Sequence, residues 1–206
     1  MLRLWGRLNS INVQKVVWAL EELGLPHERV DAGGPFGIVN TPEYRKLNPN
    51  GLVPVIEEDG FVLWESNAIV RYLAAKHGAG SLWPTDLRER ADADRWMDWQ
   101  ATAFTPAMGP AFHQLFRTSP EQRDRSIVEA AIAKAEPFAA LLDRHMGDRT
   151  YVAGAAFTMG DIAVGAAVHR WLNLPVQREP RPNLERFHRT LRERPAAAKV
   201  LVTPIT

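Results

Sequence analysis

LNPNGLVPVIEEDGFVLWES, residues 47–66, is the stretch from which the fold of the first part of the chain can be predicted. A proline has no N–H to donate to a sheet, so Val53-Pro54 fits the first position of a strand. The Asp59-Gly60 pair predicts a turn between two short strands, and Ser66 stands where a helix begins. We therefore expect a loop, an antiparallel hairpin and a helix, in that order.

Both ends of this stretch offer groups that can bind a short peptide. X-Pro bonds adopt the cis form at low cost, and a cis Val53-Pro54 bond would direct the Val53 N–H and C=O outward, where an extended peptide can pair with them. The start of the helix at Ser66 offers a hydroxyl and free N–H groups to a carboxylate, and Glu65 can hold an ammonium group. The alternatives are an ordinary trans proline and a simple N-cap serine.

The residues before this stretch predict a strand, a helix and a second strand. Residues 2–5 form a short apolar run, and apolar residues at helical spacing follow from Val13 to Leu23. Gly24 and Pro26 end that helix. Residues 27–31 can form the next strand, residues 32–40 a glycine-rich loop, and residues 42–47 a helical turn. The order β-α-β-α-β-β-α is that of a thioredoxin-like α/β domain, which we place at residues 1–78.

The rest of the chain predicts an all-α domain over residues 87–206, joined by a linker at residues 79–86. We expect breaks in the first long helix at Pro106 and Pro110 and a bend in the second at Pro137. Thr158 and Asp161 are spaced as a capping box that opens a helix through Trp171, so we expect Asp161 to be structural. A last helix over residues 182–194 and a tail through Pro204 complete the prediction.

The composition excludes several classes of function. The 206 residues include 25 Lys and Arg against 24 Asp and Glu, a formal charge of +1, so no overall field attracts nucleic acid or an acidic membrane. The chain has no cysteine, which excludes a thiol carried by the protein itself. The six histidines show no metal-ligand spacing, so we expect no metal. No signal peptide or membrane-spanning run is evident, and we expect a cytoplasmic protein.

Three motifs in order give the chain a family resemblance. Ser10-Ile11-Asn12-Val13-Gln14-Lys15-Val16, Val53-Pro54 and Glu65-Ser66 resemble the glutathione-binding half of soluble glutathione transferases, closest to the serine-type classes such as phi and theta. The resemblance covers nearly the whole chain. It implies glutathione as co-substrate and a homodimer.

The resemblance also implies roles for particular residues. Ser10 would stabilise the glutathione thiolate, with Asn12 as the alternative catalytic residue. The residues implied in glutathione binding are Leu52, Val53, Pro54, Glu65 and Ser66. Two departures stand out. Leu52 replaces a Gln or Lys that is frequent in relatives and leaves only a backbone anchor. Residues 31–40 hold no basic side chain, so Arg45 and Lys46 are the candidates for the glycine carboxylate.

The resemblance implies that the glutathione thiol attacks a hydrophobic electrophile held against the helical domain. The aromatic residues that can line that site are Phe36, Trp96, Trp99, Phe104 and Phe112. Aromatic residues at helical spacing can equally form a core. Two other functions stay open. One is a glutathione-dependent disulfide-bond oxidoreductase, and the other is a non-catalytic assembly module of the same fold.

Overall fold

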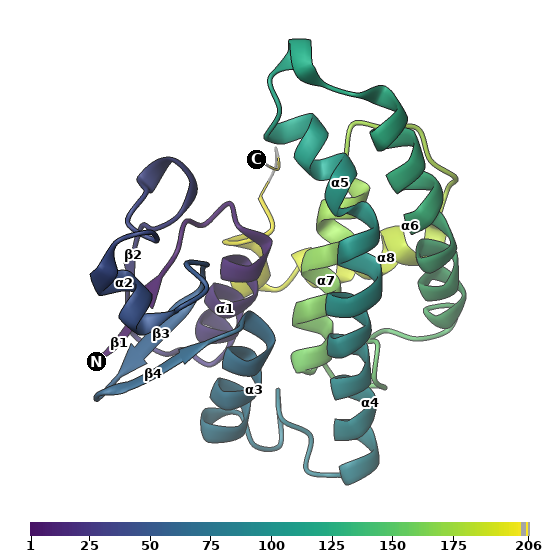
Figure 1. The fold of residues 1–206 in the computed structure, drawn as a ribbon. Helices are drawn as coiled ribbons and strands as arrows, with labels where there is room; N and C mark the ends of the chain where they lie inside the picture. Colours follow the sequence, from purple (N-terminus) through teal and green to yellow (C-terminus); the bar gives the residue numbers. More distant parts are fainter. Residues whose placement is uncertain (203–204, 206) are drawn as a thin grey trace.

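The first part of the chain forms a four-stranded mixed sheet with helices on both faces (Figure 1). The computed structural model describes residues 1–202 and 205, so Pro204 of the predicted tail lies outside the described residues. The elements are β1 (Leu2–Trp5), α1 (Ile11–Glu22), β2 (His27–Val30), the 3₁₀ turn η1 (Gly34–Phe36), α2 (Pro42–Leu47), β3 (Val55–Glu58), β4 (Phe61–Trp64) and α3 (Ser66–His77). This order confirms the thioredoxin-like prediction.

The strand order is β2-β1-β3-β4, with β1 parallel to β2 and antiparallel to β3. The hairpin from β3 to β4 turns at Asp59, whose φ is 50°, and Gly60, whose φ is 85°. Positive φ at both positions is what a tight hairpin turn requires, which explains why Asp-Gly predicted it.

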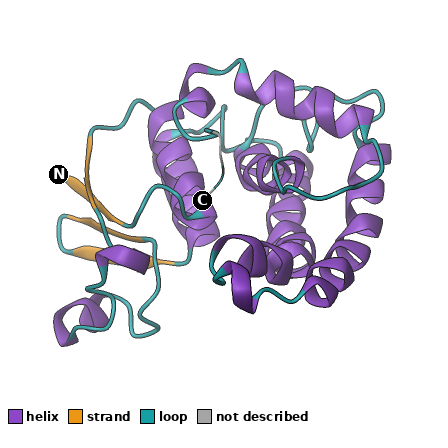
Figure 2. Ribbon diagram, turned by 90° about the horizontal axis from the view of Figure 1, so that it is seen from above, coloured by secondary structure: helices purple, strands orange, loops and turns teal. Residues whose placement is uncertain are grey.

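The second part of the chain is helical, as predicted. Its elements are α4 (Leu87–Trp99), the π-helical turn η2 (Gln100–Phe104), α5 (Thr105–Phe116), the 3₁₀ turn η3 (Pro120–Gln122), α6 (Arg125–His145), α7 (Met159–Leu172), α8 (Pro182–Arg192) and α9 (Pro195–Ala198). Viewed from above, the helices stand to one side of the sheet (Figure 2). The segment between α3 and α4 contains only an isolated bridge between Ala79 and Trp83.

The predicted helix breaks at Pro106 and Pro110 were wrong, because α4, η2 and α5 follow one another without interruption. In η2 the Thr105 N–H donates to the Gln100 C=O, five residues back, so the helix is widened just before Pro106. Pro106 has no N–H to donate to the preceding turn. A π-helical turn changes the hydrogen-bond spacing just before it and so lets the helix continue. Pro110 is exposed, and water can satisfy the carbonyl that it leaves unpaired. Helix α6 also continues through Pro137.

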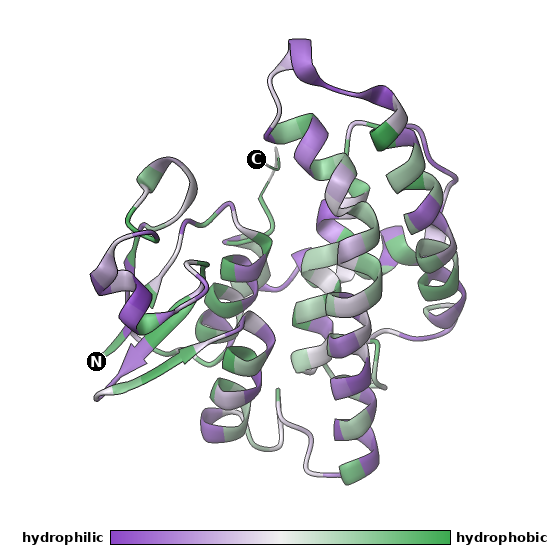
Figure 3. Ribbon diagram, in the orientation of Figure 1, coloured by the Kyte–Doolittle hydropathy of each residue, from purple (hydrophilic) through white to green (hydrophobic). Residues whose placement is uncertain are grey.

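One hydrophobic core joins both parts of the chain. It contains residues of β1, α1 and α3 together with residues of α4 to α9, and α7 lies at its centre with Met159 to His169 all buried. The apolar colouring of α7 reflects that position (Figure 3). Gly165 lets α7 approach α1 closely, since a methyl group there would lie 2.5 Å from Leu191 and 3.0 Å from Trp18. The face of α1 and α3 away from the sheet is therefore covered by helices.

Asp161 holds the start of α7 in place, and the predicted capping box is present. Its fully buried carboxylate accepts hydrogen bonds from the Val152 N–H at 2.8 Å, the Thr158 N–H at 2.8 Å and the Thr158 hydroxyl at 3.1 Å. Burial raises the pKa of Asp161 to about 7, although these hydrogen bonds favour the charged form. The side chain therefore ties the connection before α7 to the helix itself.

We predict that Asp161→Ala lowers the free energy of unfolding by about 2 to 4 kcal/mol, because two buried N–H groups lose their acceptor. Urea unfolding measures this loss. Asp86→Ala is the control, since Asp86 caps α4 at an exposed site and its loss should cost about 1 kcal/mol. Unchanged unfolding together with lost activity would contradict the structural role.

Two histidines connect α7, α8 and the segment after α9. His169 Nδ1 lies 2.9 Å from His188 Nε2, and His169 Nε2 lies 3.0 Å from the Val202 carbonyl oxygen. A carbonyl only accepts, so His169 Nε2 carries a hydrogen and its neutral ring accepts from His188. Burial, followed by the charge of His169 and of Arg192, lowers the pKa of His188 to about 4. Burial also lowers the pKa of His169.

This pair predicts a loss of stability in mild acid. Unfolded histidines protonate below about pH 6.5, whereas folded His188 stays neutral until about pH 4, so the free energy of unfolding falls between these values. Between pH 7 and pH 5, the free energy of unfolding of His188→Asn should fall by about 1 kcal/mol less than that of the wild type. Urea unfolding at the two pH values measures this difference. His77→Asn, at an exposed site, is the matched control variant. A His188→Asn slope equal to that of the wild type would refute this coupling.

Candidate functional site

The first part of the site is the turn between β1 and α1. Ser10 occupies the N-cap position of α1, but its side chain makes no capping hydrogen bond. Its backbone N–H donates to the Arg7 C=O at 3.1 Å, which closes the turn. The hydroxyl is thus half-buried at a helix N-terminus, where the helix dipole favours an anion, and it is not used by the helix.

The second part of the site is the start of α3, which lies against the start of α1. The Ser66 hydroxyl donates to Asn12 Oδ1 at 3.3 Å. Ser66 is buried and is the first residue of α3, not its N-cap, so the simple capping role considered for it is wrong. Two helix N-termini therefore converge, and their unpaired N–H groups face the same region. Only the Oδ1 of the Asn12 amide is used in this bond, and its N–H groups donate to none of the described residues.

Glu65 occupies the N-cap position of α3 with a φ of 70° and a ψ of 109°. A positive φ is uncommon for a residue with a side chain and is concentrated at functional sites. The side chain is exposed and caps nothing. This conformation directs a carboxylate to the point where α3 begins.

The third part of the site is the loop before β3. The Val53-Pro54 bond is cis, as expected. Neither the N–H nor the C=O of Val53 makes a backbone hydrogen bond with another residue that the structure describes, so both can pair with a ligand. The Leu52 C=O accepts from Tyr44 Oη at 2.8 Å and from Asn48 Nδ2 at 2.9 Å, and the Leu52 side chain is exposed. These two hydrogen bonds anchor the loop before β3 to α2 and to the residue that follows α2.

Sequence reasoning missed Lys15, which lies beneath the site. The Lys15 Nζ donates to Asn67 Oδ1 at 2.9 Å and to Gln100 Oε1 at 3.3 Å, and so connects α1, α3 and η2. Burial lowers the pKa of Lys15 to about 7, while the charge of Glu65 opposes that shift. Position 15 is four residues from buried Ile11 and four from buried Ala19, so a lysine on the buried face of α1 was the available signal.

The two candidates for the glycine carboxylate, Arg45 and Lys46, lie in the last turn of α2. The Arg45 guanidinium donates to the Pro49 C=O and to Asn40 Oδ1, each at 3.0 Å, and so braces the loop around α2. Lys46 is exposed on the same short helix. The Arg45 guanidinium therefore already has two acceptors in the segments on either side of α2.

The predicted aromatic residues separate into two groups. Trp96, Trp99 and Phe104 pack together in the helical core, and Phe104 is fully buried against Trp171 at a centroid distance of 5.9 Å. Trp96 and Phe104 are therefore core residues, whereas Trp99 is only partly buried. Phe36 is 50% exposed in η1, and Phe112 of α5 lies under two arginines. The Phe36 ring is therefore accessible to a ligand, whereas Phe112 is only 8% exposed and its ring is covered by the arginines.

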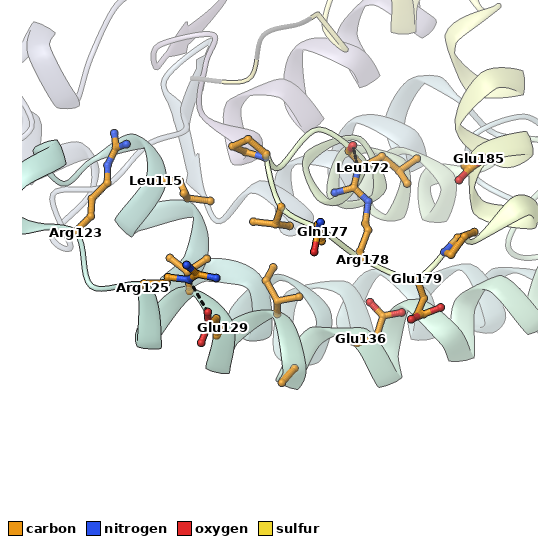
Figure 4. A pocket seen from close by; sticks show the side chains of 16 residues that line it. Leu115, Arg123, Arg125, Glu129, Glu136, Leu172, Gln177, Arg178, Glu179 and Glu185 are labelled. Atoms are coloured by element: carbon orange, nitrogen blue, oxygen red, sulfur yellow. Dashed lines mark hydrogen bonds and ion pairs between the residues drawn. The ribbon is translucent and has the colours of Figure 1, made fainter.

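A large groove lies elsewhere on the molecule. It measures about 1330 Å³ and is lined by residues of α5, α6 and the connection from α7 to α8, including Glu136, Gln177 and Arg178 (Figure 4). None of the predicted site residues lines it, so its size does not identify the site. Among the described residues no helix is long and apolar enough to cross a membrane, and no group of three or more potential ligands could hold a metal ion.

Comparison with known families matches both parts of the chain. Residues 9–76 match the family model described as "Glutathione S-transferase, N-terminal domain", and residues 122–190 match "Glutathione S-transferase, C-terminal domain". The first range contains every proposed glutathione-binding residue named above. The two ranges together span more than half of the chain.

Relatives extend the match to the whole chain. Glutathione S-transferase GstB of Escherichia coli K12 is 42% identical, over 100% of both chains. Elongation factor 1-gamma 2 of Oryza sativa is 29% identical over 92% of this chain and 46% of its own length. A theta class glutathione S-transferase from Xanthomonas axonopodis pv. citri, solved with glutathione bound, is 40% identical with a TM-score of 0.96, covering 100% of this chain and 99% of its own. This chain therefore belongs to the glutathione S-transferase family.

Proposed function

We propose that the groups around the starts of α1 and α3 bind glutathione and hold its thiol as a thiolate beside Ser10. The observation that supports this most is the convergence of the unused Ser10 hydroxyl, the Asn12–Ser66 pair and the free backbone groups of Val53. The related Xanthomonas enzyme was solved with glutathione bound. The same ligand suits this site.

Each part of the tripeptide has a matching group in this proposal. The Val53 N–H and C=O pair with the glutathione backbone, as an added strand would. The α-carboxylate lies at the α3 N-terminus near Ser66, and the α-ammonium is held by Glu65. Leu52 and Pro54 shape the loop that presents Val53. Buried Lys15 keeps the starting residues of α3 fixed through Asn67.

For this reaction the protein must ionise the glutathione thiol near neutral pH. A free thiol has a pKa of about 8.5, and a donor hydroxyl together with a helix N-terminus lowers that pKa by stabilising the anion. Ser10 supplies the hydroxyl and α1 the dipole, while water takes the proton. The thiolate then forms a carbon–sulfur bond with the electrophile, and the leaving group, such as chloride, departs with the electrons of the broken bond.

We predict that Ser10→Ala raises the pKa of the bound thiol by about 1 to 2 units, because a hydrogen bond to a charged group contributes about 1.5 to 3 kcal/mol. The ultraviolet absorbance of the thiolate against pH measures this shift. The conjugation kcat/KM at pH 6.5 should fall by about tenfold or more. Ser119→Ala is the control, since Ser119 also stands at an N-cap position without a capping bond.

The variant Asn12→Ala tests whether Asn12, rather than Ser10, stabilises the thiolate. If Asn12 stabilises the thiolate, this variant shows the larger pKa shift and Ser10→Ala keeps full activity, which would remove Ser10 from its assigned role. Ser66 must be monitored in the same experiment, because its hydroxyl loses its acceptor in Asn12→Ala. Glutathione binding by calorimetry separates that loss of affinity from a change in the thiol.

We expect activity with an aryl halide and lower activity with hydroxyethyl disulfide, because Ser10 provides a hydroxyl and the chain has no cysteine. Parallel assays with both substrates measure the difference. Higher activity with the disulfide would favour the oxidoreductase. Binding of glutathione with no turnover of either substrate would favour a non-catalytic module, a possibility kept open by the similarity to an elongation factor subunit.

The remaining parts of the proposal concern organisation. We propose a glutathione-binding domain at residues 1–78, a linker at 79–86 and a helical domain from residue 87, with exposed Phe36 at the electrophile site. We also propose a detoxification role and a cytoplasmic homodimer. Exposed apolar side chains on the first domain, Phe61 at 45% and Trp64 at 37%, support a contact between subunits. Sedimentation velocity tests the dimer.

A further inference from the structure

Three arginines gather where the β1–α1 turn meets the helical domain. Arg7 is three residues before Ser10, and its backbone C=O accepts the Ser10 N–H. Arg170 lies on α7, with its Cζ 3.8 Å from the centroid of the Phe112 ring. Arg117 follows α5, with its Cζ 5.3 Å from the same ring. The cluster therefore spans the boundary between the two parts of the chain, beside the proposed thiolate.

The guanidinium groups of Arg7 and Arg170 have no carboxylate partner among the described residues, whose ion pairs all involve other side chains. The Arg7 Nε is buried and makes no hydrogen bond to them. Arg7 is also close to the glycine-rich loop, since a methyl group on Gly34 would lie 3.0 Å from its Nε. A buried donor without an acceptor costs free energy unless a ligand supplies one.

The electrostatics agree with this geometry. Burial, followed by repulsion from Arg117 and Arg7, lowers the pKa of Arg170 to about 10. Burial and then Arg117 lower the pKa of Arg7. The three cations therefore act on one another, in a chain whose formal net charge is only +1. A small cavity of about 140 Å³ next to Arg170 is bordered by Leu8 and Asn9 of the same turn.

We propose that Arg7, Arg117 and Arg170 bind a carboxylate group of the electrophile, so that this protein prefers anionic electrophiles to neutral ones of the same shape. This inference rests on the proposed conjugation at Ser10 and names its substrate class. A guanidinium offers a planar pair of donors that matches a carboxylate. The Phe112 ring lies under Arg170 and Arg117, so it supports these two guanidinium groups. The alternative is that the arginines only cover apolar surface.

The test uses two substrates that differ in charge and hardly in shape, 4-chloro-3,5-dinitrobenzoate and its carboxamide. For each, the kcat/KM for conjugation is divided by the uncatalysed rate constant with glutathione, and the ratio of the two quotients gives the preference for the carboxylate. We expect a clear preference in the wild type, weakened by salt. Arg170→Gln and Arg7→Gln should each reduce it about tenfold, and Arg170→Lys should reduce it less.

Arg90→Gln is the matched control, because Arg90 also lies over an aromatic ring, 4.9 Å from the centroid of Trp83, but outside the cluster. Its preference for the carboxylate should equal that of the wild type. Equal quotients for the two substrates in the wild type, or a preference that both glutamine variants retain, would overturn the inference. Neither result would contradict the proposed conjugation of glutathione at Ser10.

A binding measurement separates this inference from the proposed function. The glutathione conjugates of the two substrates can be prepared chemically, and calorimetry gives their dissociation constants without any turnover. Tighter binding of the carboxylate conjugate, lost in Arg170→Gln, supports the arginine site even if the protein does not catalyse conjugation. Equal binding of the two conjugates refutes it.

Discussion

The arrangement of the two halves depends on the hydrogen bonds that the Lys15 side chain donates. This side chain is almost fully buried where α1, α3 and η2 meet, and two amide oxygens, of Asn67 and Gln100, receive its hydrogen bonds. A buried charge is costly unless it is hydrogen-bonded, so these three segments can pack together in few other ways. Asn67 then donates to the Met97 C=O at 2.8 Å, which extends the connection into α4.

The site follows from this arrangement. Because α1 and α3 are locked side by side, their first residues meet, and the Asn12–Ser66 hydrogen bond joins them. The ligand groups are mostly backbone atoms at helix starts and before a strand, so few side chains are needed for recognition. The helical domain contributes Arg117 and Arg170, which are close enough to Arg7 of the Ser10 turn to repel it. We therefore propose that the thiol and the electrophile meet at the boundary between the two halves.

Local sequence signals predicted the elements well and the packing less well. The Asp59-Gly60 turn, the Thr158–Asp161 capping box and the cis Val53-Pro54 bond depend on neighbours in the chain, and all three are present. Pro106 misled the prediction because a proline ends a regular helix, whereas the π turn before it changes the local spacing. The periodicity of Trp96 and Phe104 did not distinguish core from cleft, because both are apolar environments.

The sequence by itself determined the order of elements, the first thioredoxin-like unit, the helical second half and the residues that begin α1 and α3. These are short-range properties, set by φ preferences, capping groups and apolar spacing. Only the tertiary structure decided that Lys15 is buried, that Ser10 is left without a capping bond and that Arg7, Arg117 and Arg170 share one region. The reason is physical: burial and charge proximity depend on contacts between residues far apart in the chain, which no local pattern specifies.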